Sequence, residues 1–309
     1  MNTSRNHQLY CRLLLLAAFT LPSPAEVPIE GDQHAPKVAA DQADSIFDYD
    51  DTAPLSLHEV GRETRGSALI RDIAFTPIDQ PVKAFLVSPA ATAGPHPAVL
   101  YVHWLGEPAT TNRTEFLDEA VALAGRGVYS LLVDTMWAEP KWYGQRVPEE
   151  DYAHSIRQVI ELRRALDLLL AQPGVDSHRV ALVGHDFGSM YGLLAGALDR
   201  RPKTYVLIAG VPHFIDWFLF ARQPQNPAAY RRQVAPLDPV NFIGRLAPAS
   251  VFFQFAQKDD FVSATQAAEF FAAAGPNKHR VTYAGGHALH TAAVAAYRVA
   301  WLTRELDLN

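Results

Sequence analysis

The stretch RVALVGHDFGSMYG, residues 179–192, is typical of a buried strand, a tight turn and the start of a helix. Asp186 stands at the tip of that turn, with Gly184 and Gly188 two positions away on either side. Small residues are needed at those positions where a strand and a helix approach closely around a strained nucleophile. The pattern therefore predicts a nucleophile elbow that carries a carboxylate, which can attack carbon. The alternative is a turn in which Asp186 only caps the helix.

Two kinds of partner follow in the order acid, then histidine, as a catalytic triad of this type requires. Asp259 and Asp260 come directly after the apolar run SVFFQFA, and His287 follows the run HRVTYA. A single loop Asp or His would be an ordinary cap or a solvated residue. Here each candidate stands where a strand is expected to end, and an open α/β sheet gathers its site at the carboxyl ends of its strands. The order and the positions together predict a catalytic set.

Alternating strands and helices must position these residues. Apolar or alternating runs predict eight strands, over 68–76, 82–88, 98–103, 128–134, 179–184, 204–209, 250–256 and 279–284. Helical patterns cover 114–126, 151–171, 187–199, 264–274 and 290–306. We therefore expect the α/β class, with a mostly parallel sheet, helices on both faces and an antiparallel edge formed by the first two strands.

Residues 211–248 interrupt this alternation with aromatic residues, basic residues and several prolines. An insertion that follows the carboxyl end of a strand often forms a lid or a pocket wall. A plain long loop with a helix is the alternative.

Four further stretches share a recognisable pattern: PAVLYVHWLGEP (97–108), LVGHDFG (182–188), FAQKDDFV (255–262) and YAGGHAL (283–289). They resemble the α/β-hydrolase superfamily, within its dienelactone hydrolase and acyl-peptidase-like branch. The resemblance implies an α/β-hydrolase fold over 67–309, with 211–248 as its lid or pocket insertion. The spacing in this family favours Asp259 over Asp260 and His287 over His290.

The chain departs from the family pattern at two positions. Many members have Ser or Cys at the elbow, whereas Asp186 resembles epoxide hydrolases and haloalkane dehalogenases, which share the G-H-D-aromatic-G turn. Dehalogenases tend to have Trp next, whose indole N–H holds halide, and Phe187 has no such donor. Where members often have His-Gly, this chain has Trp104, which is expected to narrow the approach to the oxyanion region.

The resemblance implies a mechanism for an aspartate nucleophile. Since a carboxylate is ionised above about pH 4, Asp186 can open an epoxide or expel halide and form an alkyl ester. His287, oriented by Asp259, would then deprotonate the water that hydrolyses it. Attack on a carboxylic ester would give a less favourable mixed anhydride, so Asp186 could instead act there as a general base.

Other groups would assist this chemistry. The backbone N–H of Phe187 and that of Trp104 or Leu105 would form the oxyanion hole. Opening an epoxide also calls for an acid on its oxygen, for which Tyr143 and Tyr230 are candidates. The alternative is that both tyrosines only pack.

The N-terminus predicts export. Arg5 and Arg12 precede the apolar run LLLLAAFTL, and a small-residue cleavage pattern with Ser23 and Ala25 follows it. We therefore expect a signal peptide over 1–25 and a periplasmic or secreted protein; an amphipathic or disordered leader is the alternative. Residues 26–66 are expected to form a surface arm, partly ordered around SIFDYD.

Composition excludes several classes of partner. The formal net charge is −6 and no run of Lys or Arg occurs, so no nucleic-acid partner is expected. No 18-residue apolar run is present, so no membrane anchoring is expected after signal cleavage. The one cysteine lies in the signal peptide, and no zinc, EF-hand, P-loop or dinucleotide motif occurs, so no metal and no cofactor are expected.

Three hypotheses follow for function. The first is an exported hydrolase that acts on a small epoxide, carbon–halogen compound, ester or lactone through Asp186, Asp259 and His287. The second is a dienelactone hydrolase-like carboxylic ester hydrolase with the same residues. The third is a catalytically inactive fold relative that acts as a binding protein, which Trp104 and Asp186 would favour.

Overall fold

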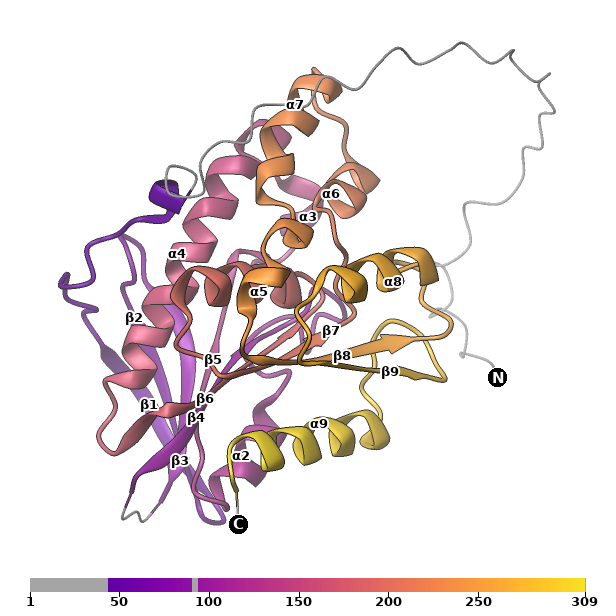
Figure 1. Cartoon of the computed structure of the whole chain (residues 1–309). Coiled ribbons are helices and arrows are strands. Elements are labelled where there is room, and N and C mark those ends of the chain that lie inside the picture. Colours follow the sequence, from indigo (N-terminus) through magenta and orange to yellow (C-terminus); the bar gives the residue numbers. More distant parts are fainter. Residues whose placement is uncertain (1–43, 91–93, 309) are drawn as a thin grey trace, which may run out of the picture. The chain divides into compact units, whose positions relative to one another are not determined.

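The computed structural model describes residues 44–90 and 94–308, and within them the strands form one mixed sheet (Figure 1). Its nine described strands are ordered β1-β2-β3-β5-β4-β6-β7-β8-β9. The strands are β1 (His58–Arg65), β2 (Ala68–Phe75), β3 (Val82–Pro89), β4 (His96–Val102), β5 (Tyr129–Val133), β6 (Val175–His185), β7 (Thr204–Ile208), β8 (Ser250–Ala256) and β9 (Lys278–Tyr283). Strands β1, β2, β3 and β5 pair antiparallel in that order, and the pairs from β5 through β4 to β9 are parallel.

Helices cover both faces of the sheet. The α-helices are α2 (Leu117–Ala124), α3 (Trp142–Gln145), α4 (Asp151–Leu170), α5 (Phe187–Asp199), α6 (Ile215–Ala221), α7 (Pro227–Val234), α8 (Ala264–Ala273) and α9 (Ala292–Glu305). Helices α2 and α9 lie on one face, and α4, α5 and α8 lie on the other (Figure 1). The short 3₁₀ helices are η1 (Ser45–Phe47), η2 (Met136–Ala138), η3 (Pro148–Glu150), η4 (Ala235–Leu237), η5 (Pro239–Asn241) and η6 (Ile243–Leu246). None of the helices in the described ranges is long and apolar enough to cross a membrane.

The central strands form the core. Every residue of β4 and of β7 is buried. Strands covered on both faces must be apolar almost throughout, which is the pattern that predicted them. The α/β class, the mostly parallel sheet, the antiparallel edge and the helices on both faces are confirmed.

The sheet has one strand more than predicted. Strand β1 pairs antiparallel with β2, in a segment that the sequence had assigned to the N-terminal arm. Seven of its eight residues are exposed, and Val60 is 64% exposed. A strand exposed on both faces need not alternate apolar and polar residues. The sequence of β1, HEVGRETR, lacks this alternation, which is why no strand was predicted there. The eight-strand prediction is corrected to nine within the described residues.

The start of the described arm lies against the α/β domain. Phe47 in η1 is 1% exposed, and its carbonyl accepts from Arg163 of α4 at 2.9 Å. The predicted signal peptide and residues 26–43 of the arm lie outside the described residues, so export stays a prediction.

The insertion is largely helical. Between β7 and β8 it forms α6 and α7, followed by η4, η5 and η6. The ring of Trp217 lies 5.1 Å from that of Phe187, edge to face, and Phe218 is stacked on Phe187 at 5.9 Å. Helix α6 therefore packs against the start of α5, where the predicted elbow lies.

Candidate active site

Asp186 forms the turn between β6 and α5 by itself. Strand β6 ends at His185 and α5 begins at Phe187. The backbone of Asp186 has φ 57° and ψ −122°, a conformation that non-glycine residues rarely adopt. Such strain is what a nucleophile elbow requires, because it lifts the tip side chain out of the turn.

The glycines beside the tip allow three backbone segments to approach closely. A Cβ on Gly184 would lie 2.2 Å from the carbonyl oxygen of Gly188. A Cβ on Gly188 would lie 2.2 Å from the carbonyl oxygen of Val102 at the end of β4. Any side chain at either position would therefore force strand and helix apart.

The structure brings Asp186, Asp259 and His287 into direct contact. Nε2 of His287 lies 2.8 Å from Oδ2 of Asp186, and Nδ1 of His287 lies 2.9 and 3.1 Å from the two carboxylate oxygens of Asp259. The side chains of Asp186 and His287 are 9% exposed and that of Asp259 is 1% exposed. Asp260, the other acid in the stretch, is exposed.

The two carboxylates control the charge of His287. Burial alone would lower the pKa of this imidazole, but hydrogen bonds and charge from Asp186 and Asp259 outweigh burial and raise it to about 9. For Asp259, burial acts to raise the pKa, and the contact with His287 and the amides of Phe261 and Val262 hold it below its usual value. At neutral pH the group is therefore an imidazolium between two carboxylates.

The three amides considered for the oxyanion hole differ in their hydrogen bonding. The N–H of Phe187 donates to Oδ1 of Asp186 itself. The N–H of Trp104 donates to Oε2 of Glu115 at 2.7 Å, so it is not directed at a substrate. Among the described residues the N–H of Leu105 has no hydrogen-bond partner. Of the alternatives Trp104 and Leu105, the arrangement favours Leu105 as the second donor.

Aromatic side chains enclose the imidazole of His287. Its ring centroid lies 5.0 Å from that of Phe261, 6.0 Å from that of Trp217 and 6.4 Å from that of Trp104. Trp217 comes from the insertion, and its indole N–H donates to the carbonyl of Phe261 at 3.1 Å. Phe261 is 49% exposed, so it marks the side on which the triad approaches solvent.

The two tyrosines considered as acids both donate to protein acceptors. The hydroxyl of Tyr143 donates to the backbone carbonyl of Trp217. The hydroxyl of Tyr230 donates to the buried carboxylate of Asp151. In this arrangement neither hydroxyl is directed at a substrate on Asp186.

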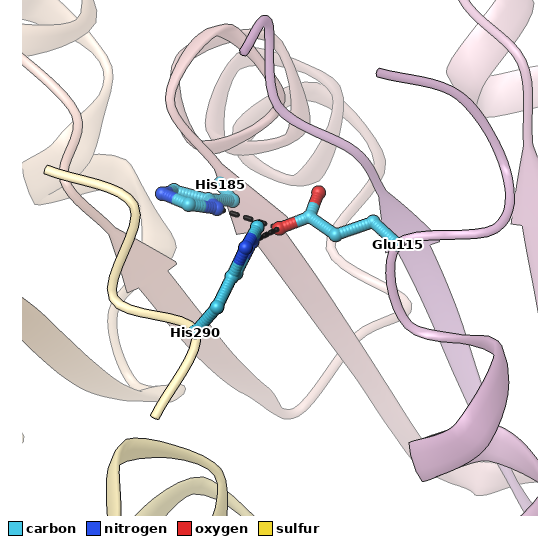
Figure 2. A group of neighbouring side chains, drawn as sticks. All are labelled: Glu115, His185 and His290. Atoms are coloured by element: carbon cyan, nitrogen blue, oxygen red, sulfur yellow. Dashed lines mark hydrogen bonds and ion pairs between the residues drawn. The ribbon is translucent and has the colours of Figure 1, made fainter. Parts of the chain in front are cut away.

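Glu115, His185 and His290 form a second polar cluster, which the sequence did not predict (Figure 2). It lies next to His287, whose ring centroid is 5.8 Å from that of His185. Oε1 of Glu115 lies 2.6 Å from Nδ1 of His185 and 3.0 Å from Nε2 of His290. Glu115 and His185 are each 1% exposed and His290 is 39% exposed. In the sequence, Glu115 resembles an ordinary acid at a helix start, and the three residues stand too far apart to form a local motif. The prediction that no metal binds was drawn from local motifs alone, so it did not consider this cluster.

Comparison with known proteins shows likeness at the level of fold. No protein-family model matches the chain, and no curated protein matches it. Among solved structures, an acetyl xylan esterase from Paenibacillus sp. R4 is similar with TM-score 0.69 and 18% identity, over 87% of this chain and 93% of that one. Acetyl xylan esterase 1 from Thermoanaerobacterium sp. JW/SL YS485 is similar with TM-score 0.68 and 16% identity, over 86% and 93% of the two chains.

A glucuronoyl esterase from Solibacter usitatus is similar with TM-score 0.60 and 16% identity, over 86% of this chain and 91% of that one. These likenesses and the sheet topology show that the chain has the α/β-hydrolase fold. Placement in the dienelactone branch stays a prediction.

Proposed function

We propose that this protein is a hydrolase in which Asp186 attacks the substrate to form a covalent ester, and His287 activates the water that releases it. The observation that carries the proposal is the position of one imidazole between two carboxylates, 2.8 Å from Asp186 and 2.9 Å from Asp259. A residue that only capped α5 would need neither partner.

The protonated state of His287 suits the first step. Oδ2 of Asp186 attacks a saturated carbon of an epoxide, and the bond from that carbon to the epoxide oxygen breaks. The departing oxygen takes the proton from Nε2 of His287. The products of this step are an alkyl ester on Asp186, a hydroxyl on the substrate and a neutral imidazole. Because His287 supplies the proton, this route needs no tyrosine.

Loss of the negative charge on Asp186 then makes His287 a base. With one carboxylate neutralised as an ester, the pKa of His287 falls, because Asp186 is one of the two groups that raise it. His287 takes a proton from water, and the oxygen of that water attacks the carbonyl carbon of the ester.

Release restores the resting state. During attack by water, Oδ1 becomes an oxyanion, and the N–H of Phe187 already donates to this atom. The bond between the carbonyl carbon and Oδ2 then breaks, and Oδ2 leaves with the product, which takes the proton of the new carboxyl group. Asp186 is again a carboxylate that contains one oxygen from water, and His287 is again protonated.

The surroundings favour an epoxide over a haloalkane. A departing halide needs an N–H donor, and the two tryptophans whose rings contact His287 use their indole N–H groups elsewhere: Trp104 donates to Thr110 at 3.0 Å and Trp217 donates to the carbonyl of Phe261 at 3.1 Å. The aromatic residues around His287 suit a small apolar substrate.

Hydrolysis of a carboxylic ester or lactone is the second candidate function. The names of the proteins with similar structures, acetyl xylan esterase and glucuronoyl esterase, favour it. The occupied N–H of Phe187 weighs against it, because Oδ1 of Asp186 takes the position that the substrate carbonyl would need. An ester substrate would therefore use Asp186 as a general base toward water.

Trapping the covalent ester tests the proposal. The wild-type chain, quenched with acid during turnover of a panel of small epoxides, haloalkanes and short-chain esters, is expected to carry an adduct on the peptide that contains Asp186, measured by intact-protein and peptide mass spectrometry. The Asp186→Asn variant should form none, and the Asp260→Asn variant, altered at the exposed neighbouring acid, should turn over like wild type. Wild-type activity retained in both Asp186→Asn and His287→Gln would refute the proposal.

A further inference from the structure

We infer that Glu115, His185 and His290 form a binding site for a divalent transition-metal ion of the zinc class. Each residue offers one ligand atom, and these atoms, Oε1, Nδ1 and Nε2, lie within 4.8 Å of one another (Figure 2). Two imidazole nitrogens and one carboxylate oxygen are a ligand set that zinc accepts in proteins, with a solvent molecule in the fourth position.

The spacing of the ligand atoms is close to that of a metal site. Oε1 of Glu115 lies 2.6 Å from Nδ1 of His185 and 3.0 Å from Nε2 of His290. Ligands at about 2.0–2.2 Å from a tetrahedral zinc ion are separated from each other by roughly 3.3 Å. The two contacts to Oε1 are therefore shorter than in a zinc site by less than about 1 Å, and the three ligand atoms, which all lie within 4.8 Å of one another, would have to shift to surround the ion. The exposed ring of His290 can make most of this adjustment, because it is 39% exposed while the other two side chains are buried.

Two of the ligand side chains have hydrogen-bond partners of the kind that orient ligands in metal sites, namely the N–H of Trp104 and the carbonyl of His287. Oε2 of Glu115 accepts from the N–H of Trp104 at 2.7 Å, which leaves Oε1 to face the histidines. Nε2 of His185 lies 3.4 Å from the carbonyl oxygen of His287, which can accept a hydrogen bond from it. A ligating histidine commonly donates its other N–H to a backbone carbonyl in this way, and a ligating carboxylate is itself hydrogen-bonded. Nδ1 of His185 lies 2.6 Å from the carboxylate of Glu115 and donates to it in the metal-free chain, so a bound ion would replace that proton.

The three ligands come from segments that also carry Asp186, His287 and the backbone amides of Trp104 and Leu105. Glu115 lies in the loop between β4 and α2 and binds the amide of Trp104, next to Leu105. His185 is the last residue of β6 and precedes Asp186, and His290 follows His287 by three residues. A bound ion would therefore link all three segments, and its binding should stabilise the folded chain.

Metal binding by the tag-free full chain, stripped with a chelator and dialysed, tests the inference. We expect one equivalent of Zn²⁺ by equilibrium dialysis, one equivalent of Co²⁺ with the intense visible absorption of four-coordinate cobalt, and a higher melting temperature with either ion. The His290→Ala variant removes the exposed ligand and should bind at least about tenfold more weakly. The matched control is His178→Ala, which removes an exposed histidine outside the cluster and should bind as wild type does.

Two results would overturn the inference: no stoichiometric binding by the folded wild type, or equal affinity in wild type and His290→Ala. Glu115→Gln is a second variant that keeps the shape of the side chain, and it should also lose affinity. If Glu115→Gln does not fold, His290→Ala still decides, because its side chain is partly exposed. The readout is binding and not turnover, so it is independent of the proposed hydrolysis; the His287→Gln variant should bind the metal normally.

Discussion

The two acids that contact His287 lie in different environments. Asp259 is 1% exposed, and its Oδ1 accepts from the amides of Phe261 and Val262 at 2.9 and 3.0 Å. Asp186 is more exposed, and its Oδ2 has His287 as its partner. The fixed carboxylate of Asp259 therefore suits orientation of the imidazole, and the carboxylate of Asp186 at the strained tip suits attack on the substrate.

The raised pKa of His287 predicts how stability depends on pH. The folded-state pKa of about 9 lies above the ordinary value of about 6.5. The stabilisation that His287 contributes to the folded state is therefore fully present below about pH 6.5 and is lost as the pH rises through about 9. Urea unfolding between these limits should show a falling free energy of unfolding. An NMR titration of His287 measures the cause directly.

The Asp186→Asn variant is the control for this titration. It removes one of the two carboxylates, so the pKa of His287 should fall, and the loss of stability with rising pH should be smaller and should end at a lower pH. A wild-type His287 that titrates near its ordinary value would contradict the ion-pair arrangement.

Replacement of the orienting acid should impair turnover more than binding. In Asp259→Asn the amide no longer balances the imidazolium and favours the wrong tautomer, so kcat should fall by about 10³–10⁴-fold with little change in KM. Steady-state kinetics on the best epoxide of the panel measures this. The Asp260→Asn variant, altered at the adjacent acid, should keep wild-type kinetics. An equal loss of kcat in both variants would show that Asp259 does not act by orienting His287.

At the scale of the elements, the elbow was predictable because all its determinants are local. An apolar strand, two glycines and a helix rich in small and apolar residues occur within fourteen residues, 179–192. The direction of the Trp104 amide was not predictable, because it depends on Glu115, which lies in a different turn of the same loop. The contact of Trp217 with the triad was also beyond the sequence, because a helical pattern alone does not say where α6 lies.

Because the backbone of α5 approaches that of β4 closely at Gly188, a methyl group added there should destabilise the fold, whereas one added at Gly144 should not. In Gly188→Ala the new Cβ would meet backbone atoms of Val102 and His103, which cannot move without disturbing β4, so the variant should lose at least about 2 kcal/mol of stability. In Gly144→Ala the new Cβ meets no atom within 4 Å, and the change should be neutral or stabilising. Chemical unfolding of the two variants measures the difference, and similar values for both would contradict the described packing.

At the scale of the whole molecule, a buried ion pair joins helices distant in sequence. Arg298 of α9 contacts Glu119 of α2 through Nε at 2.9 Å and Nη2 at 2.6 Å. The side chains are 8% and 7% exposed, and Tyr101 of β4 also donates to Glu119, at 3.1 Å. The pair holds α2 and α9 together on one face of the sheet.

Removal of the cation should be costly because it leaves Glu119 buried without its partner. Arg298→Met is expected to destabilise the fold by about 3–5 kcal/mol. The control is Arg304→Met in the same helix, where the side chain is 64% exposed and the loss should be at most about 1 kcal/mol. A loss of the same size in both variants, measured by urea unfolding, would show that burial of the pair does not matter.

The cluster of Glu115, His185 and His290 shows what sequence reasoning could not reach. Its members come from a loop, the end of a strand and a second loop, and only the order of β4 and β6 in the sheet brings the first two together. The contact among Asp186, Asp259 and His287 was predictable despite similar distances in sequence, because each residue follows a recognisable strand.

A single turnover in water labelled with heavy oxygen tests whether Asp186 bonds covalently to the substrate. With enzyme in excess over an epoxide substrate, we expect the label to enter the carboxyl group of Asp186, detected by peptide mass spectrometry, and the product to carry an unlabelled oxygen. Label in the product with none in Asp186 would mean direct attack by water and would refute a covalent ester on Asp186.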